Sequence, residues 1–231
     1  MDLVVLCPTR GRPEAAREAR ASFLDTRRST GSELIFVVDN DDPEIKGYHE
    51  IESPGVVVME QPSYGNMVGA LNTAALWSLK VLNPGYLGFV GDDHRFQTSG
   101  WDEYFLDLLR ARNGGMVYGN DLNRRDGDIP TQIVMSASIV KALGWMGLPS
   151  CHHLYIDNVW RVIGDEVGCL FYMPDVVIEH LHPAFGKAVW DEGHRRVNSA
   201  EMYNHDAMAY SAWLSTDMEE DVRRVKAALG A

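Results

Sequence analysis

The sequence contains few cysteines and no segment with the features of an export signal or a membrane anchor. Cys7, Cys151 and Cys169 are odd in number and show no CxxC spacing, which argues against a disulfide framework and against a zinc ribbon. The first residues lack the basic flank and the long apolar stretch of a signal peptide, and no apolar run approaches the length that spans a bilayer. We therefore expect a soluble protein of a reducing, cytoplasmic compartment, with no membrane partner.

Basic residues are also scarce relative to acidic ones. The chain has 21 Lys and Arg against 33 Asp and Glu, a formal net charge of −12, which disfavours non-specific binding of nucleic acid through the whole surface. Arginines nevertheless cluster at Arg124/Arg125 and Arg195/Arg196, so a local basic groove remains open as an alternative. The length of 231 residues suits one domain with a sizeable core.

Apolar runs alternate with helical patterns along the first half of the chain. The predicted strands are Leu3–Leu6, Leu34–Val38, Val56–Met59 and Tyr86–Val90, and the predicted helices between them include Glu14–Leu24 and Asn66–Leu82. Parallel neighbouring strands need crossover connections, which helices usually supply. The pattern therefore predicts a single-domain α/β fold with a mostly parallel sheet flanked by helices.

The second half of the chain gives weaker signals. Helical spacing of large apolar residues follows Trp101, which we expect in the core, and a polar loop is expected over Asn120–Pro130. A capping box, Thr216-x-x-Glu219, predicts the start of the last helix. The other expected elements are a strand at Gly115–Gly119, helices at Ser136–Leu143 and Asp157–Ile163, and two brief strands at Cys169–Met173 and Val176–Ile178.

The segment Tyr86–Phe96 carries the most informative pattern. Its apolar run stops at Asp92, Asp93 and His94, and open α/β sheets place their ligands at the carboxyl ends of the strands. Carboxylates and an imidazole at such a position predict a metal site. The alternative is a polar turn in which an aspartate caps the element that follows.

Motifs in a fixed order then indicate a family. They are Pro8–Arg10 after the first strand, Asp39 after the second, Gly65–Asn66 opening the long helix, Gly91–His94 after the central strand, Tyr155–Asn158, and Val177–His180. Together they resemble a GT-A fold glycosyltransferase, close in layout to family 2 of these enzymes, over roughly the first four-fifths of the chain. The run Phe89–Phe96, with Gly100–Asp102 after it, resembles small soluble enzymes carried by tailed phages.

The resemblance implies a metal-dependent transfer of a sugar from a nucleotide-sugar donor, with a UDP-sugar favoured. The cofactor would be Mn²⁺, or Mg²⁺, bound by Asp92, His94 and His180, with Asp93 and His182 as alternatives. A cation at this position would offset the charge that grows on the departing diphosphate. His94 stands where a standard DXD motif has a carboxylate, and Ile156 replaces the glutamate of the Glu-Asp motif, so the stereochemistry of transfer stays open.

The same resemblance assigns residues to the donor and the acceptor. Asp157 matches the position of a catalytic base if transfer inverts the anomeric centre, or orients the acceptor if transfer retains it. The segment Ala184–Asn198 is expected to close as a lid. We divide the domain into a nucleotide-binding half at 1–95, an acceptor half at 96–198 and C-terminal helices at 199–231. Donor binding is assigned to Pro8, Thr9, Arg10, Arg12, Asp39, Asn66, Asp92, Lys187 and Arg195.

The sequence leaves several alternatives open for the acceptor and for the class of activity. A hydroxymethylated base in phage DNA, a virion protein and a small molecule are all candidate acceptors, and a phage-encoded enzyme would act in the host cytoplasm. A sugar nucleotidyltransferase ranks second, because Pro8–Arg12 is poorer in glycine than the phosphate loop such an enzyme needs. A non-catalytic module that binds a nucleotide or a sugar is the third candidate.

Overall fold

An eight-stranded sheet, in the order β3-β2-β1-β4-β7-β6-β8-β5, organises the chain. The computed structural model describes residues 1–123 and 128–230, so Arg124 and Arg125 lie outside the described residues. The strands are β1 Leu3–Thr9, β2 Ser32–Asp39, β3 Val56–Gln61, β4 Tyr86–Phe89, β5 His94–Phe96, β6 Met116–Asn120, β7 Ile133–Ser136 and β8 Leu170–His180. The helices are α1 Pro13–Thr26, α2 Ile45–His49, α3 Met67–Val81, α4 Trp101–Ala111, α5 Ala137–Leu143, α6 Ile156–Val167, α7 Glu192–Val197, α8 Ala200–Thr216 and α9 Met218–Leu229, with a 3-10 turn at Pro183–Phe185.

The first half of the sheet is parallel, and its strands β1 and β2 are largely buried on both faces. Strand β1 pairs in parallel with β2 and with β4, and β2 pairs in parallel with β3. Helix α1 begins at Pro13, as expected, and α3 begins after Asn66, whose side chain accepts the Gly69 N–H at 2.7 Å. Because these strands run in one direction, their carboxyl ends meet at the same edge of the sheet. The predicted mostly parallel α/β fold is confirmed.

The second half of the sheet contains both parallel and antiparallel strand pairs. Strand β7 lies antiparallel to both β4 and β6, and β8 runs parallel to β6 before it pairs antiparallel with β5. The expectation of two brief strands at Cys169–Met173 and Val176–Ile178 is wrong, because β8 is one long strand with a register shift opposite Gly119/Asn120. This long strand places His180 opposite His94 in the β5–β8 register.

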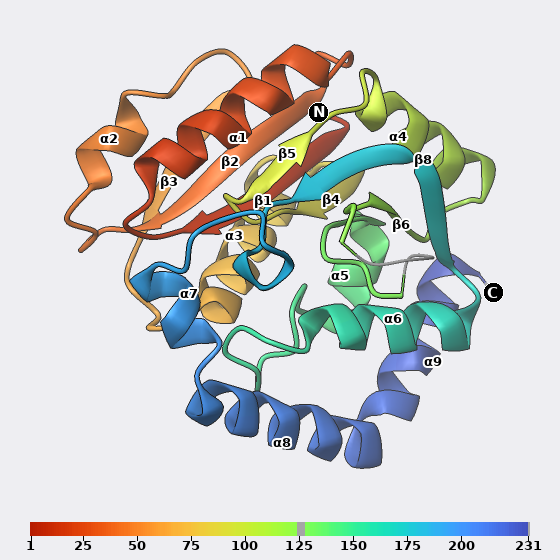
Figure 1. Ribbon diagram of the computed structural model, residues 1–231. Helices are drawn as coiled ribbons and strands as arrows, with labels where there is room; N and C mark the ends of the chain where they lie inside the picture. Colours follow the sequence, from red (N-terminus) through yellow and green to blue (C-terminus); the bar gives the residue numbers. More distant parts are fainter. Residues whose placement is uncertain (124–127, 231) are drawn as a thin grey trace.

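Helices pack around the sheet (Figure 1), and two apolar clusters of side chains lie on its two faces. Side chains of α3, α5 and α6 pack on one face, and Trp213 of α8 and Val225 of α9 join that cluster. Side chains of α1, α2 and α4 pack on the other face, where Trp101 is 1% exposed, as the sequence predicts. Burial of such large side chains supplies most of the driving force for folding. No helix within residues 1–123 and 128–230 is both long and apolar enough to cross a membrane.

The C-terminal region differs from the sequence-based expectation. The predicted capping box at Thr216 is wrong, because Thr216 is the last residue of α8 and α9 begins at Met218 with no side-chain cap. The Thr216 hydroxyl lies 3.0 Å from the Ala212 carbonyl oxygen, to which it donates a hydrogen bond within its own helix. The aromatic-rich stretch that ends near Trp213 is the 17-residue helix α8, which lies within the region of C-terminal helices expected at 199–231 but whose bounds the sequence analysis did not give.

Candidate metal centre

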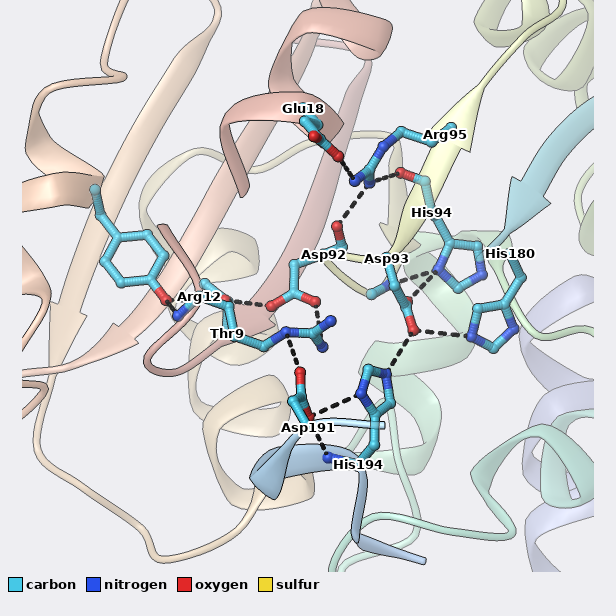
Figure 2. A network of polar contacts seen from close by, with 12 residues as sticks. Thr9, Arg12, Glu18, Asp92, Asp93, His94, Arg95, His180, Asp191 and His194 are labelled. Atoms are coloured by element: carbon cyan, nitrogen blue, oxygen red, sulfur yellow. Dashed lines mark hydrogen bonds and ion pairs between the residues drawn. The ribbon is translucent and has the colours of Figure 1, made fainter. Parts of the chain in front are cut away.

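The two adjacent aspartates after β4 turn toward different partners (Figure 2). Asp92 is 5% exposed, and its carboxylate accepts the Thr9 hydroxyl at 2.6 Å and pairs with Arg12 Nη1 at 2.8 Å. Thr9 ends β1 and Arg12 precedes α1, so both partners come from the nucleotide-binding half that the sequence predicts. Asp92 therefore belongs to the β1 side of this edge of the sheet.

Asp93 instead faces a group of histidines. Its carboxylate lies 3.2 Å from His180 Nε2, 3.3 Å from His94 Nδ1 and 3.6 Å from His194 Nε2. The rings of His94 and His180 stack with centroids 4.3 Å apart, because the β5–β8 register sets these residues opposite each other. Asp93, His94 and His180 each offer a ligand atom within 4.8 Å of the others. The geometry thus brings together three of the five predicted metal-binding residues.

This cluster fits a divalent transition metal. His94 is 2% exposed, and its Nε2 atom has no hydrogen-bond partner in the described part of the chain. A buried ring nitrogen without a partner is costly unless it binds a ligand or an ion. Burial, with the nearby His180, lowers the pKa of His94 and so favours the neutral ring, whose Nδ1 lone pair accepts the Gly91 N–H at 3.0 Å and lies 3.3 Å from Asp93. One carboxylate with several imidazoles suits manganese better than magnesium, which prefers oxygen ligands.

The environment separates the two aspartates electrostatically. Burial raises the pKa of Asp92 to about 6, although Arg12 opposes this effect. Burial acts in the same direction on Asp93, but hydrogen bonds and charge from His180, with help from His194 and His94, hold the pKa of Asp93 well below its usual range. Asp93 is therefore the firmly ionised carboxylate, which is the form that binds a cation.

Helix α7, within the segment expected as a lid, lies against this cluster, and its His194 was not predicted as a site residue. His194 is 5% exposed, and its Nδ1 atom lies 2.8 Å from Asp191, which in turn lies 3.4 Å from Arg12 Nε. The hydrogen bond to Asp93 raises the pKa of His194. The signal in the sequence is the Asp191-x-x-His194 spacing, because Asp191 caps α7 by accepting the His194 backbone N–H at 2.7 Å.

His182 lies beside the cluster without joining it. Its ring meets the His180 and His194 rings edge to face, with centroids 5.2 and 5.7 Å away. Its Nδ1 atom accepts the Ala184 N–H at 3.2 Å and so begins the 3-10 turn at Pro183–Phe185. Of the two late histidines, His180 is the one whose ligand atom belongs to the cluster.

Several residues assigned to donor binding lie along the carboxyl ends of β1 and β2. Asp39, the last residue of β2, accepts hydrogen bonds from Arg10 Nη1 at 3.0 Å and from the Ser63 hydroxyl at 3.2 Å. The Tyr48 hydroxyl lies 3.1 Å from Thr9 Oγ1 and accepts the Arg12 backbone N–H at 2.8 Å, so it fixes the loop between β1 and α1. Pro8, within β1, completes this part of the edge.

Three further residues of the donor set lie elsewhere. Asn66 caps α3, and its amide oxygen is used by Gly69. Lys187 pairs with Glu179 at 2.8 Å and donates to the Leu122 carbonyl at 3.2 Å. Arg195 is exposed on α7, in the segment that carries His194.

The acceptor-side residue Asp157 stands in the first turn of α6. It follows Tyr155, whose φ of 65° is left-handed backbone that a bulky residue rarely adopts. The loop before α6 is held by Asp206 of α8, a carboxylate with 0% exposure. Asp206 accepts the backbone N–H groups of His152, His153 and Leu154 at 2.7–2.9 Å. The sequence analysis missed Asp206, since its partners lie more than 50 positions away along the chain.

Known glycosyltransferase structures share this mostly parallel α/β sheet and its flanking helices. A mannosyltransferase from Pyrobaculum calidifontis, solved with GDP-Man and Mn²⁺, matches with a TM-score of 0.66 at 13% identity, over 99% of this chain and 74% of that one. S. aureus TarS 1-349, solved with UDP-GlcNAc, matches with a TM-score of 0.61 at 12% identity, over 100% of this chain and 80% of that one.

Sequence comparison adds no relative to these structures. No protein-family model matches the chain. No curated protein matches it either. At identities of 12–13% the structural likeness establishes the fold, which is that of GT-A-like glycosyltransferases.

Proposed function

We propose that the protein is a metal-dependent glycosyltransferase that moves a sugar from a nucleotide-sugar donor to an acceptor hydroxyl. The observation that carries the proposal is the Asp93, His94 and His180 cluster beside the Asp39 and Thr9 edge of the sheet. The same fold is found in a mannosyltransferase bound to GDP-Man and Mn²⁺ and in TarS bound to UDP-GlcNAc. A UDP-sugar is the donor we favour, and Mn²⁺ the cation.

The residues of the cluster divide the work of binding. Asp93, His94 and His180 hold the cation in this proposal, and His194 supports Asp93 from α7. A divalent cation, when bound, offsets the negative charge that develops on the departing diphosphate. Arg12, held between Asp92 and Asp191, offers a guanidinium fork to the same phosphate oxygens.

The acceptor side of the proposal rests on α6. Asp157 takes the proton of the acceptor hydroxyl if the anomeric centre is inverted, and orients the acceptor if the centre is retained. The anomeric configuration of the product distinguishes the two roles. Candidate acceptors for the assay are a hydroxymethylated DNA base, a protein and a free saccharide.

The first test measures nucleotide binding through its effect on thermal unfolding. The melting temperature of the protein is measured with UDP, GDP, CDP and dTDP, each with Mn²⁺, with Mg²⁺ and with a chelator. A ligand that binds only the folded state raises its stability by RT ln(1 + [L]/Kd), which is about 2.7 kcal/mol at a hundredfold excess over Kd. We expect one nucleotide to raise the melting temperature with Mn²⁺ and to lose the effect with chelator. No shift with any of the four would refute the proposal.

A further inference from the structure

A second group of metal-ligating side chains lies between α8 and the loop before α6. His152, His205 and Asp206 each offer a ligand atom, and these atoms all lie within 4.8 Å of one another. His152 belongs to the loop, whereas His205 and Asp206 are neighbours on α8. The group shares no residue with the cluster around Asp93, so its chemistry is separate from that of the candidate metal centre.

Asp206 holds the His205 ring in the orientation that metal-binding histidines usually have. The Nδ1 atom of His205 lies 2.8 Å from Asp206 Oδ1, and an Nδ1–H donated to this carboxylate leaves the Nε2 lone pair for a metal ion. Asp206 itself is fully buried, and each of its oxygens already has two partners, which are His205 and the backbone N–H groups of residues 152–154. Asp206 therefore acts through His205, whose Nε2 atom is the ligand that α8 offers.

His152 supplies a second imidazole. Its ring stacks on the His205 ring with centroids 3.8 Å apart. Within the described part of the chain, His152 forms hydrogen bonds through its backbone alone, to Asp206 and to Val68, so its ring can turn toward a shared ion at the cost of the stacking contact only. The His205 side chain is 44% exposed and His152 is partly exposed, which lets an ion reach both rings from solvent.

We infer that His152 and His205 bind a late first-row divalent cation, with Zn²⁺ as the representative ion. Imidazole nitrogens suit zinc, nickel and copper, whereas magnesium and calcium prefer oxygen ligands. Glu201 is exposed and lies four residues before His205 on α8, the spacing at which helix side chains are neighbours, so its carboxylate is the candidate third ligand. Water completes the four-coordinate sphere that Zn²⁺ adopts in proteins. The bound ion fastens α8 to the loop before α6.

The test measures Zn²⁺ binding by calorimetry after chelator treatment, in a protein whose candidate metal centre is removed by Asp93→Asn and His180→Ala. In this background we expect one equivalent of Zn²⁺ to bind with micromolar or tighter affinity. His205→Asn removes Nε2 but keeps an amide donor in the place of Nδ1 beside Asp206, and His152→Phe keeps the stacked ring but removes both nitrogens. Each should weaken binding at least about tenfold, because the loss of an outer partner alone costs a metal site about that much. In the otherwise wild-type protein, each should remove one equivalent of bound Zn²⁺.

His49→Asn is the matched control. The His49 side chain is 39% exposed, close to the value for His205, and lies within 3.3 Å of Glu52 and 2.9 Å of Glu60. It belongs to none of the groups that bring three ligand atoms together in the described residues, so its loss should leave Zn²⁺ binding unchanged. Hydrogen exchange tests the fastening itself, since Zn²⁺ should slow exchange of the amides of residues 152–154 in the wild type but not in His205→Asn.

Three results would overturn the inference. They are absence of Zn²⁺ binding in the background without the candidate metal centre, an affinity unchanged by both His205→Asn and His152→Phe, and loss of binding in His49→Asn instead. None of them bears on nucleotide binding, which tests the proposed function separately.

Discussion

Asp206 allows a quantitative prediction about the loop that leads to Asp157. Its carboxylate is fully buried and accepts hydrogen bonds from three consecutive backbone N–H groups. The Nδ1 atom of His205 also lies 2.8 Å from Asp206 Oδ1. In Asp206→Ala these three donors lose their only charged partner. Each hydrogen bond to a charged group is worth roughly 1.5–3 kcal/mol, but the loop is half-exposed, so water restores part of the loss. We expect a decrease of roughly 3–5 kcal/mol in the free energy of unfolding.

The assay is thermal and urea unfolding followed by circular dichroism. For a chain of this size, 1 kcal/mol corresponds to about 2 °C, so the melting temperature of Asp206→Ala should fall by about 8 °C. Asp221→Ala is the control, because Asp221 is 5% exposed and accepts the Trp213 Nε1–H at 3.0 Å, with the half-exposed Arg224 guanidinium as a long, 3.5 Å partner. The control should lose only about 1–2 kcal/mol. Equal losses in the two variants, or a loss below about 1 kcal/mol in Asp206→Ala, would refute the reasoning.

Three further predictions concern the candidate site. His180→Ala and Asp93→Asn should each abolish the Mn²⁺-dependent rise in melting temperature with nucleotide while changing the melting temperature of the free protein little, and a variant that melts early by itself would indicate a structural role instead. Asp157→Asn should bind the nucleotide as the wild type does and lose transfer in a product assay, and retained transfer would remove Asp157 as the base. Burial raises the pKa of Asp92 to about 6, above its unfolded value of about 3.9, so the folded state holds this proton more tightly and loses stability as pH rises from about 4 to 6. The free energy of unfolding is therefore measured without metal at pH 4 and pH 7 for the wild type and for Asp92→Asn. The stability of Asp92→Asn relative to the wild type should be greater at pH 7 than at pH 4. An equal difference between the two proteins at both pH values would contradict the raised pKa.

The parallel half of the fold was predictable because each signal there is local. Apolar runs bounded by proline, glycine and asparagine give β1 to β4, α1 and α3 within a few residues, whereas the short helix α2 was not predicted. Strand β7 was not predictable, since it has only four residues and α5 follows it at once with no proline or glycine between them. The bounds of helix α8 were not predictable within the expected helical region 199–231, because its mixture of aromatic and polar residues lacks a clear apolar face.

The candidate site was predictable only as far as strand ends reveal it. The rule that ligands gather at the carboxyl ends of parallel strands selects Asp39, Asp92 and Asp93, and their functional roles remain predictions. Which of two adjacent aspartates faces the histidines depends on the backbone after β4, and no periodic pattern describes that turn. His194 lies on a six-residue helix more than 100 positions from Asp93, and only the packing of α7 brings the two together.

The division between Asp92 and Asp93 explains why both carboxylates can occupy one buried turn. Two adjacent buried carboxylates repel each other and resist ionisation together. The fold gives each its own compensation: Asp93 has three imidazoles, and Asp92 has the Thr9 hydroxyl and the Arg12 guanidinium. Compensation is incomplete at Asp92, whose pKa stays raised to about 6. Arg12 also pairs with Asp191 of α7, so a ligand that draws Arg12 away weakens its contacts with Asp92 and with α7 at the same time. The Arg12 guanidinium, which is proposed to bind the diphosphate, thereby links Asp92 to the helix that carries His194 through its two ion pairs.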